Sequence, residues 1–125
     1  MDSRGKIGKM GEDAVCKYLI AKGHSILERN WRSGHREIDI ISLAGDGIHF
    51  VEVKSLTAPA RFRPEQKVGL AKQKLVASAA QSYLHKKDNS FLWGKEAWLD
   101  VAAVIFDKGQ TRISYFPAAY TAIYF

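Results

Sequence analysis

The fold is decided by residues 36–54, whose sequence is R-E-I-D-I-I-S-L-A-G-D-G-I-H-F-V-E-V-K. Two runs rich in isoleucine and valine flank a short Ala-Gly-Asp-Gly segment, which is the pattern of a β-hairpin. Gly45 and Asp46 suit a two-residue loop at the tip, because glycine can adopt the positive φ that a type II′ turn requires. The stretch therefore predicts two antiparallel strands joined by a tight turn.

This loop also sets the register of the two strands. Each step outward from the tip pairs one residue of each strand, so Asp39 is expected opposite Glu52 and Glu37 opposite Lys54. Side chains two residues apart lie on the same face of a strand, so all four share one face. The hairpin is thus expected to carry a cluster of three carboxylates and one lysine.

Two interpretations of this cluster are open. Opposed cross-strand side chains have Cβ atoms about 4.5–5.5 Å apart, and two carboxylates that close oppose each other's ionisation unless a cation lies between them. Mg²⁺ binds oxygen ligands at about 2.0–2.1 Å, commonly one or two carboxylates with water and phosphate, which suits Asp39 and Glu52. The alternative is a solvated ladder in which Lys54 offsets Glu37 and Asp39, each ion pair contributing about 0.2–1 kcal/mol. The spacing alone favours neither.

Length and composition indicate a single globular domain spanning residues 1–125. Hydrophobic residues make up 46% of the chain and charged residues 26%, as in soluble proteins. No apolar stretch is longer than a strand, and the first residues lack the apolar core of a signal peptide, so neither membrane spanning nor secretion is expected. The single cysteine, Cys16, cannot form an internal disulfide, which fits a cytoplasmic location.

The chain is basic, with 19 Lys and Arg against 13 Asp and Glu, a net charge of +6 and a pI near 9.5. Such a balance favours polyanionic partners, with nucleic acid as the first candidate. A carboxylate pair inside a basic chain is compatible with a protein that attracts phosphate and holds a metal ion at one acidic spot.

A helix is expected upstream, over residues 9–22, with Gly23 just past its C-terminus. At 100° per residue Glu12 falls on the same side as the apolar Val15, so its carboxylate is expected to face inward or toward a cleft. The alternative is that Glu12 lies in the first turn and stabilises the helix dipole by about 0.3–1 kcal/mol. Cys16, also on the inward side, is expected in the core.

Residues 25–32 predict a strand that leads directly into the hairpin, which gives three consecutive antiparallel strands. This strand holds Trp31 between Arg29 and Arg32, an arrangement able to contact a phosphate backbone and stack on a base. The alternative is that Trp31 belongs to the core and the arginines are solvated.

Residues 55–67 contain two prolines and no helix or strand period, which predicts a loop leaving directly from the acidic cluster. Its basic residues suit an arm that grips a nucleic-acid strand, or else they are solvated charges in an ordinary connection. They are Arg61, Arg63 and Lys67. A helix over about residues 65–85 carries Lys72 and Lys74 in its first half, either directed at the acidic face or solvated.

The remaining chain predicts further strands. Residues 98–106, W-L-D-V-A-A-V-I-F, are apolar except for Asp100, whose carboxylate must be paired or lie at the open end of the strand. A short strand is possible at residues 91–93, and residues 111–116 return as a strand that Pro117 ends. The order of elements indicates an α/β protein with a mixed central sheet flanked by helices.

This order, with acidic residues on the second and third strands and E-V-K on the third, resembles the PD-(D/E)XK nuclease superfamily. More closely, the chain resembles the YraN-like family of predicted bacterial endonucleases. The likeness extends over nearly the whole chain, in the segments G-K-M-G-E-D-A-V-C-K-Y-L, R-E-I-D-I-I, F-V-E-V-K, K-Q-K-L and W-L-D-V-A-A-V. It implies a restriction-endonuclease-like αβββαβ core, and the similarity to Holliday-junction resolvases implies a homodimer.

The resemblance also implies roles for the residues of the hairpin. Asp39 and Glu52 match the metal-binding carboxylates, and the main-chain carbonyl of Val53 matches a further ligand. The implied ion is Mg²⁺, with Mn²⁺ as a substitute. Lys54 matches the lysine that orients the attacking water or stabilises charge developing on the phosphate.

Two further acids match the pattern less directly. Glu12 matches a first-helix acid that helps to hold metal, directly or through water. Glu37 matches the acid of the family's G-E-I-D segment, where this chain has Arg36 in place of Gly. Ile38 stands at the position of the proline that gives the superfamily its name.

The sequence therefore predicts a metal-dependent endonuclease that hydrolyses phosphodiester bonds, with DNA, including branched or single-stranded DNA, as the expected substrate. The alternative is a non-catalytic nucleic-acid-binding module on the same fold, although simple binding requires no carboxylates near phosphate. A third hypothesis is an adaptor whose aromatic C-terminal tail recruits another protein. The residues do not distinguish DNA from RNA or endonuclease from exonuclease.

Overall fold

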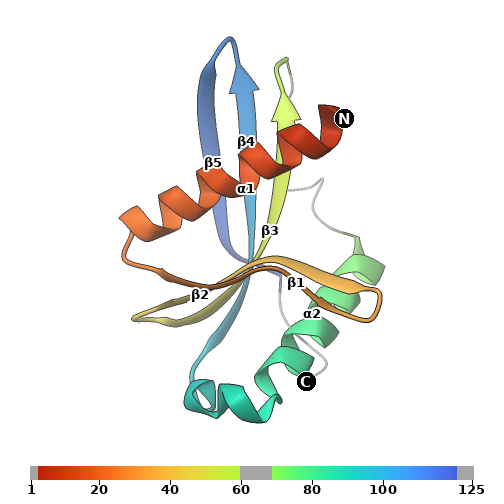
Figure 1. Ribbon diagram of the computed structural model, residues 1–125, viewed down its shortest axis with the longest axis vertical. Coiled ribbons are helices and arrows are strands. Elements are labelled where there is room, and N and C mark those ends of the chain that lie inside the picture. The colour runs from red at the N-terminus through yellow and green to blue at the C-terminus, as the bar shows by residue number, and fades with distance from the viewer. Residues whose placement is uncertain (1–2, 60–68, 121–125) are drawn as a thin grey trace.

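The computed structural model describes residues 3–59 and 69–120 (Figure 1). In these residues a five-stranded sheet has the order β1-β2-β3-β4-β5, with β3 and β4 parallel and the other neighbours antiparallel. The elements are α1 Ser3–Ala21, β1 Ser25–Ser33, β2 Arg36–Ala44, β3 Gly47–Thr57, α2 Leu70–Leu84, the 3₁₀ helix η2 Lys87–Leu92, β4 Ala97–Asp107 and β5 Gln110–Tyr120. The predicted α/β class, with its αβββαβ order and mixed sheet, is confirmed.

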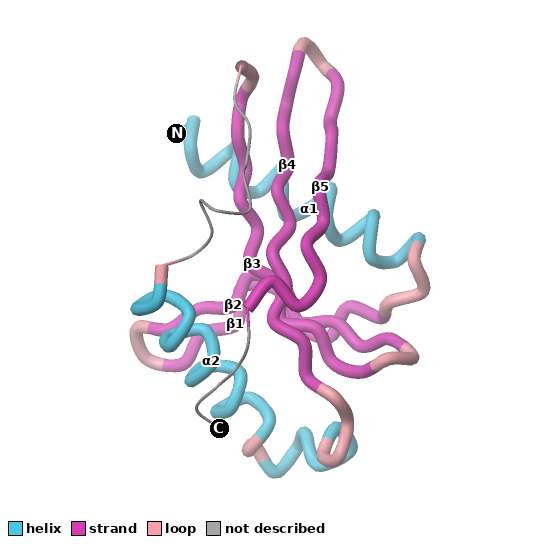
Figure 2. Tube along the Cα trace, turned by 180° about the vertical axis from the view of Figure 1, so that it is seen from behind, coloured by secondary structure: helices cyan, strands magenta, loops and turns pink. Residues whose placement is uncertain are grey.

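The two α-helices cover opposite faces of the sheet. α1 lies in front of the strands in Figure 1, and α2 lies in front of them in Figure 2, which shows the molecule from behind. On the α1 side, Val15 packs in a buried cluster with Val51 of β3. On the α2 side, Tyr83 packs edge-on against Phe50 of the same strand, with ring centroids 6.2 Å apart. β3 is therefore the central strand, buried from both sides, as its nearly continuous apolar sequence indicates.

The predicted hairpin is formed by β2 and β3, and its register is confirmed from the tip outward to Ile40, which pairs with Val51. The predicted turn type is wrong, because the positive φ lies at Gly47 (132°) and not at Gly45. A Cβ atom on Gly47 would lie 2.3 Å from the carbonyl oxygen of Glu96. The glycine is thus required where the segment before β4 packs on the hairpin, a contact distant in sequence.

The sequence predicted the C-terminal end of α1 correctly but not its N-terminal end. Gly23 has a φ of 94°, and the His24 N–H donates to the Leu19 carbonyl oxygen at 2.9 Å, so the helix ends as predicted. Its beginning is at Ser3, earlier than the predicted residue 9. No helix within residues 3–59 and 69–120 is long and apolar enough to cross a membrane.

Several other boundaries correct the predictions. α2 begins at Leu70 and not near residue 65, because Gly69 has an extended backbone. The possible strand at residues 91–93 is not formed, since this segment belongs to η2 and the turn that follows it. β3 continues to Thr57, so the connection predicted from residue 55 starts later.

The buried carboxylate of Asp100 is paired, as its position in an apolar strand required. Its Oδ2 lies 2.6 Å from His49 Nδ1 and accepts a hydrogen bond from the Tyr115 hydroxyl, and its Oδ1 accepts the Ala118 N–H at 2.8 Å. The last contact holds β5 against β4 beyond Pro117, where the sequence predicted that the strand ends. Asp100 therefore ties the central strands to the edge strand.

We expect this network to make stability depend on pH through His49. Its Nε2 lies 2.7 Å from Asp46 Oδ1, and although burial lowers the pKa of His49, the hydrogen bonds with Asp100 and Asp46 raise it on balance above 6.5. The stabilising contribution of the imidazolium is therefore complete below about pH 6.5 and is lost as pH rises through the raised pKa. His49→Gln should lower the free energy of unfolding by about 2–3 kcal/mol at pH 6, and by less at pH 9, measured by urea denaturation.

The exposed His85 supplies the control for this experiment, because it lies at the end of α2 and outside the network. His85→Gln should leave the pH dependence of the wild-type protein unchanged. A difference between wild type and His49→Gln that is the same at pH 6 and pH 9 would contradict the imidazolium assignment.

The crossing of α1 over β3 gives a second stability prediction. A Cβ atom on Gly11 would lie 1.9 Å from Ser55 Oγ, whereas a Cβ atom on Gly8 would have no neighbour within 4 Å. Gly11→Ala should lower the free energy of unfolding by about 1–3 kcal/mol through overpacking. Gly8→Ala should raise it by up to about 1 kcal/mol, because alanine favours helix. Equal stabilisation of both variants in urea denaturation would show that α1 does not approach β3 this closely.

Candidate active site

The site opens where β2 and β3 separate. Their ladder ends at Ile40 and Val51, and beyond this pair the direction of β2 departs from that of β3 (Figure 1). In place of a regular pair with Glu52, Asp39 accepts a hydrogen bond on Oδ2 from the Val53 N–H at 2.8 Å. The prediction that Asp39 lies directly opposite Glu52 is thus wrong. The Asp39 carboxylate instead binds the backbone N–H of Val53, the residue after Glu52.

A groove of about 510 Å³ lies between the first half of α1 and these two strands. Its carboxylates are those of Glu12 from α1, Asp39 from β2 and Glu52 from β3. The other residues that line it are Ile7, Gly8, Val53, Ser55, Leu56 and Thr57. Three of the acids singled out in the sequence therefore meet in one groove, although they come from three separate elements.

Burial and repulsion make this groove unfavourable for two unneutralised carboxylates. Burial first, and the charge of Glu52 second, raise the pKa of Asp39 from 3.8 to about 7. Burial also raises the pKa of Glu52, which is 8% exposed, although the charges of Lys72 and Lys54 lower it. Glu52 is buried and Asp39 is partly buried, so neither carboxylate is fully solvated, and a bound cation would relieve the repulsion between them.

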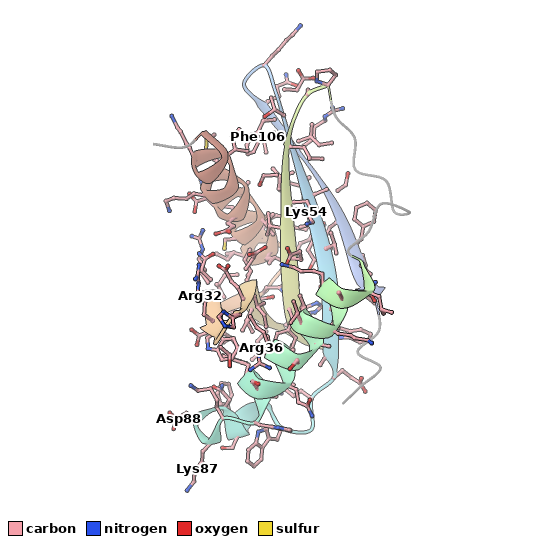
Figure 3. All side chains as sticks on the ribbon, turned by 90° about the vertical axis from the view of Figure 1, so that its right-hand side faces the viewer. Arg32, Arg36, Lys54, Lys87, Asp88 and Phe106 are labelled. Atoms are coloured by element: carbon pink, nitrogen blue, oxygen red, sulfur yellow. The ribbon has the colours of Figure 1, made fainter. Side chains whose placement is uncertain are left out.

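Two lysines approach Glu52 from different elements. Lys54 Nζ lies 3.9 Å from Glu52 Oε1, and Lys72 Nζ lies 3.7 Å from the same oxygen. Figure 3 shows Lys54 on β3, at the level of α1 and above α2. Lys72 thus reaches the acidic face from the first turn of α2, and both Lys72 and Lys74 are exposed on that helix. The three other basic residues predicted to bind nucleic acid lie outside the described residues; they are Arg61, Arg63 and Lys67.

Glu37 does not line the groove. Its Oε2 lies 3.6 Å from Nη2 of Arg32, its cross-strand partner on β1. The predicted pairing of Glu37 with Lys54 is wrong, because β2 and β3 separate before they reach these residues. Glu37 nevertheless acts on the groove through its charge, which contributes to the raised pKa of both Asp39 and Glu52.

Glu12 lies inward, at the edge of the groove. Its side chain is 18% exposed, and because α1 begins at Ser3, no acidic residue lies in the first turn. The helix-dipole alternative is therefore wrong. Glu12 Oε1 accepts a hydrogen bond from Asn30 Nδ2 at 3.1 Å and lies 3.7 Å from Arg29 Nη2. Residues of β1 thus hold the carboxylate that α1 supplies.

The donor atoms of the groove suit a hard divalent cation. Asp39 and Glu52 offer carboxylate oxygens, and Val53, whose N–H binds Asp39 Oδ2, lines the same groove. In the part of the chain that the structure describes, no group of three or more His, Cys, Asp or Glu side chains is arranged to hold a metal ion. Mg²⁺ commonly uses one or two carboxylates and takes its other ligands from water and substrate phosphate. A two-carboxylate set therefore fits Mg²⁺ or Mn²⁺.

Sequence reasoning missed two residues at this site. Asn30 has a φ of 52° within a strand, and Ser55 Oγ is buried with no hydrogen-bond partner among the described residues. Neither feature has a local sequence signal, since both depend on how α1 crosses the strands. For Trp31 the core interpretation holds, because its ring packs edge-on against Tyr83 with centroids 5.2 Å apart.

We expect Asp39→Asn to stabilise the metal-free protein at neutral and higher pH. The folded-state pKa of about 7 lies above the ordinary 3.8, so the stability of the folded state falls as pH rises from about 4 through 7. Asparagine carries no charge and can still accept the Val53 N–H. The free energy of unfolding in EDTA should rise by about 1–3 kcal/mol at pH 8 and change little at pH 4. A gain of the same size at both pH values in urea denaturation would contradict the raised pKa.

Fold and groove together define a restriction-endonuclease-like α/β protein with a site built from carboxylates and lysines. A profile of the Uncharacterised protein family UPF0102 matches residues 11–104, and the chain belongs to this family. It is 36% identical to the UPF0102 protein of Anaeromyxobacter dehalogenans over 121 residues, 95% of this chain and 87% of that protein. It is 33% identical to the UPF0102 protein of Bacteroides thetaiotaomicron, over 96% of each chain. The UPF0102 protein of Chloroherpeton thalassium is 36% identical over 88% of this chain and 83% of its own.

Proposed function

We propose that the protein is a divalent-metal-dependent nuclease of the PD-(D/E)XK superfamily that hydrolyses phosphodiester bonds in DNA. The observation that carries the proposal is the groove that the partly buried Asp39 and the buried Glu52 line together, beside Lys54. The two carboxylates occupy the second and third strands of an αβββαβ core, and the lysine follows two residues after the second of them. Simple nucleic-acid binding does not require two carboxylates near a phosphate, whereas metal-assisted hydrolysis does.

The proposed mechanism assigns a role to each of these groups. Asp39 and Glu52 would hold Mg²⁺ or Mn²⁺, with the main-chain carbonyl of Val53 as a further ligand. When bound, the ion supplies Lewis-acid polarisation of a phosphoryl oxygen and lowers the pKa of a coordinated water. Lys54, 3.9 Å from Glu52 Oε1, would offset the negative charge that develops on the phosphoryl oxygens. Lys72, which reaches the same carboxylate from α2, would bind phosphate.

The charge of the chain supports a polyanionic substrate. A net charge of +6 attracts nucleic acid to the surface, while the carboxylates confine the metal ion to one groove. A homodimer is the assembly that the resemblance to Holliday-junction resolvases implies. Light scattering at micromolar concentration should then give twice the mass of the 14.0 kDa chain.

The proposal is tested with labelled single-stranded, duplex and branched DNA and with RNA, each incubated with the protein in Mn²⁺, in Mg²⁺ and in EDTA. We expect metal-dependent cleavage at internal positions of DNA and none in EDTA. Calorimetry with Mn²⁺ provides a second measurement. Absence of both Mn²⁺ binding and cleavage, with nucleic-acid binding retained, would replace this function by a non-catalytic binding module.

A further inference from the structure

Asn30 occupies an unusual position beside the groove. Arg29 of β1 pairs with Ile40 of β2, so the next register position sets Asn30 opposite Asp39, but no regular pair forms there. The backbone of Asn30 instead has a φ of 52°, in the left-handed region. Non-glycine residues adopt this conformation at a cost, and such residues cluster at functional sites.

The side chain of Asn30 provides a reason for this conformation. Its Nδ2 donates to Glu12 Oε1 at 3.1 Å, and Arg29 Nη2 lies 3.7 Å from the same oxygen while pairing with Asp13 Oδ1 at 2.7 Å. Both contacts thus use Oε1 of Glu12 and neither uses Oε2. Asparagine suits this position, because it tolerates a positive φ better than most residues and carries an amide donor.

Glu12 separates two hollows of the surface. It lines the groove of about 510 Å³ that contains Asp39 and Glu52. It also lines a neighbouring hollow of about 420 Å³, together with Arg29 and Asn30. Gly8, one turn before Glu12 on α1, lines both hollows and has no side chain. Asn30 and Arg29, which contact the Glu12 carboxylate, both belong to β1, so the orientation of Glu12 is set from the β1 side.

We infer that Asn30 is a positioning residue, which fixes Glu12 at the edge of the groove so that its carboxylate acts, through a bound water, on a metal ion held by Asp39 and Glu52. The inference rests on the proposed function, because it requires that ion. A water-mediated role follows from the geometry, since among the described residues no three acidic side chains converge on one ion position. Residues that orient groups around a metal through hydrogen bonds commonly affect its affinity by 10–100-fold.

The test uses Asn30→Gly, which keeps a backbone suited to positive φ and removes the amide. We expect Asn30→Gly to weaken Mn²⁺ binding about tenfold, measured by calorimetry in the absence of nucleic acid. In a Glu12→Gln background the same change should have no further effect on the Mn²⁺ dissociation constant, because the carboxylate that Asn30 orients is already gone. Lys108→Gly is the matched control: Lys108 has a φ of 49° in the exposed turn between β4 and β5, and its replacement should leave Mn²⁺ binding unchanged.

Each other outcome overturns the inference in a recognisable way. If wild-type protein binds Mn²⁺ and Asn30→Gly binds it equally well, Asn30 does not position Glu12. If Asn30→Gly weakens binding equally in the Glu12 and Glu12→Gln backgrounds, the role of Asn30 is structural and does not act through Glu12. If wild-type protein binds no Mn²⁺, the proposed function fails first, and the inference falls with it.

Discussion

Asp39→Asn is expected to lower Mg²⁺-dependent cleavage by at least about 10³-fold while leaving the protein folded. A bound metal ion contributes several kcal/mol of transition-state stabilisation, and each 1.36 kcal/mol corresponds to a tenfold change in rate. Asparagine preserves the shape of Asp39 and its hydrogen bond from the Val53 N–H, 2.8 Å in the native protein, but removes the charge that binds the ion. The measurement is the single-turnover cleavage rate at saturating Mg²⁺, with circular dichroism as the test of folding.

Glu52→Gln should have an effect of similar size, and the double variant should be no worse than the more damaging single change, because both residues act through the same ion. Asp88→Asn is the control. Asp88 is an exposed carboxylate on η2, at the end of the molecule away from Lys54 in Figure 3. Cleavage by the folded double variant at the wild-type rate would remove the metal site from this groove.

Lys54→Ala is expected to lower kcat by about 10²–10³-fold, the usual loss when one preorganised group that stabilises developing charge is removed. Metal binding should not weaken. Lys54 Nζ lies 3.9 Å from Glu52 Oε1, so its removal makes the groove more negative and more attractive to a cation. A fall in kcat together with undiminished Mn²⁺ affinity is therefore the signature of this residue, measured by single-turnover kinetics and calorimetry.

Lys72→Ala provides a matched comparison, because Lys72 Nζ lies 3.7 Å from the same oxygen and the side chain is similarly exposed. It should mainly raise the substrate concentration needed for half-maximal rate, as expected for a group that binds phosphate equally in ground and transition states. If Lys72→Ala causes the larger loss of kcat, the two lysines have exchanged the roles proposed for them.

The hairpin and the end of α1 were predictable because the signals are local. The register of β2 and β3 follows from a short loop, and the chain has few ways to close a two-residue connection. Gly23 ends α1 because its left-handed backbone needs no neighbour distant in sequence. The type of turn was mispredicted for the opposite reason. Gly47 has the positive φ, and a side chain there would clash with the carbonyl of Glu96, which lies far along the chain.

The candidate site was predictable in its residues but not in its contacts. Asp39, Glu52 and Lys54 were found because a strand period of two places them on one face. These side chains do not form a regular cross-strand ladder, because β2 and β3 separate beyond Ile40. For the same reason Glu37 pairs with Arg32 of β1 and not with Lys54. Strand twist accumulates through the sheet as a whole, so no short segment determines where two strands part.

By itself, the sequence determined the main helices and strands, their order, the register of the hairpin near its tip and which carboxylates and lysine could act together. Each of these depends on backbone preferences and side-chain periodicity within a few residues. Only the tertiary structure decided that Glu12 is held by Asn30, that Lys72 reaches Glu52, and that Asp100 is tied to His49. These contacts join residues far apart in the chain, and they form because burying both faces of β3 under two helices brings their side chains together.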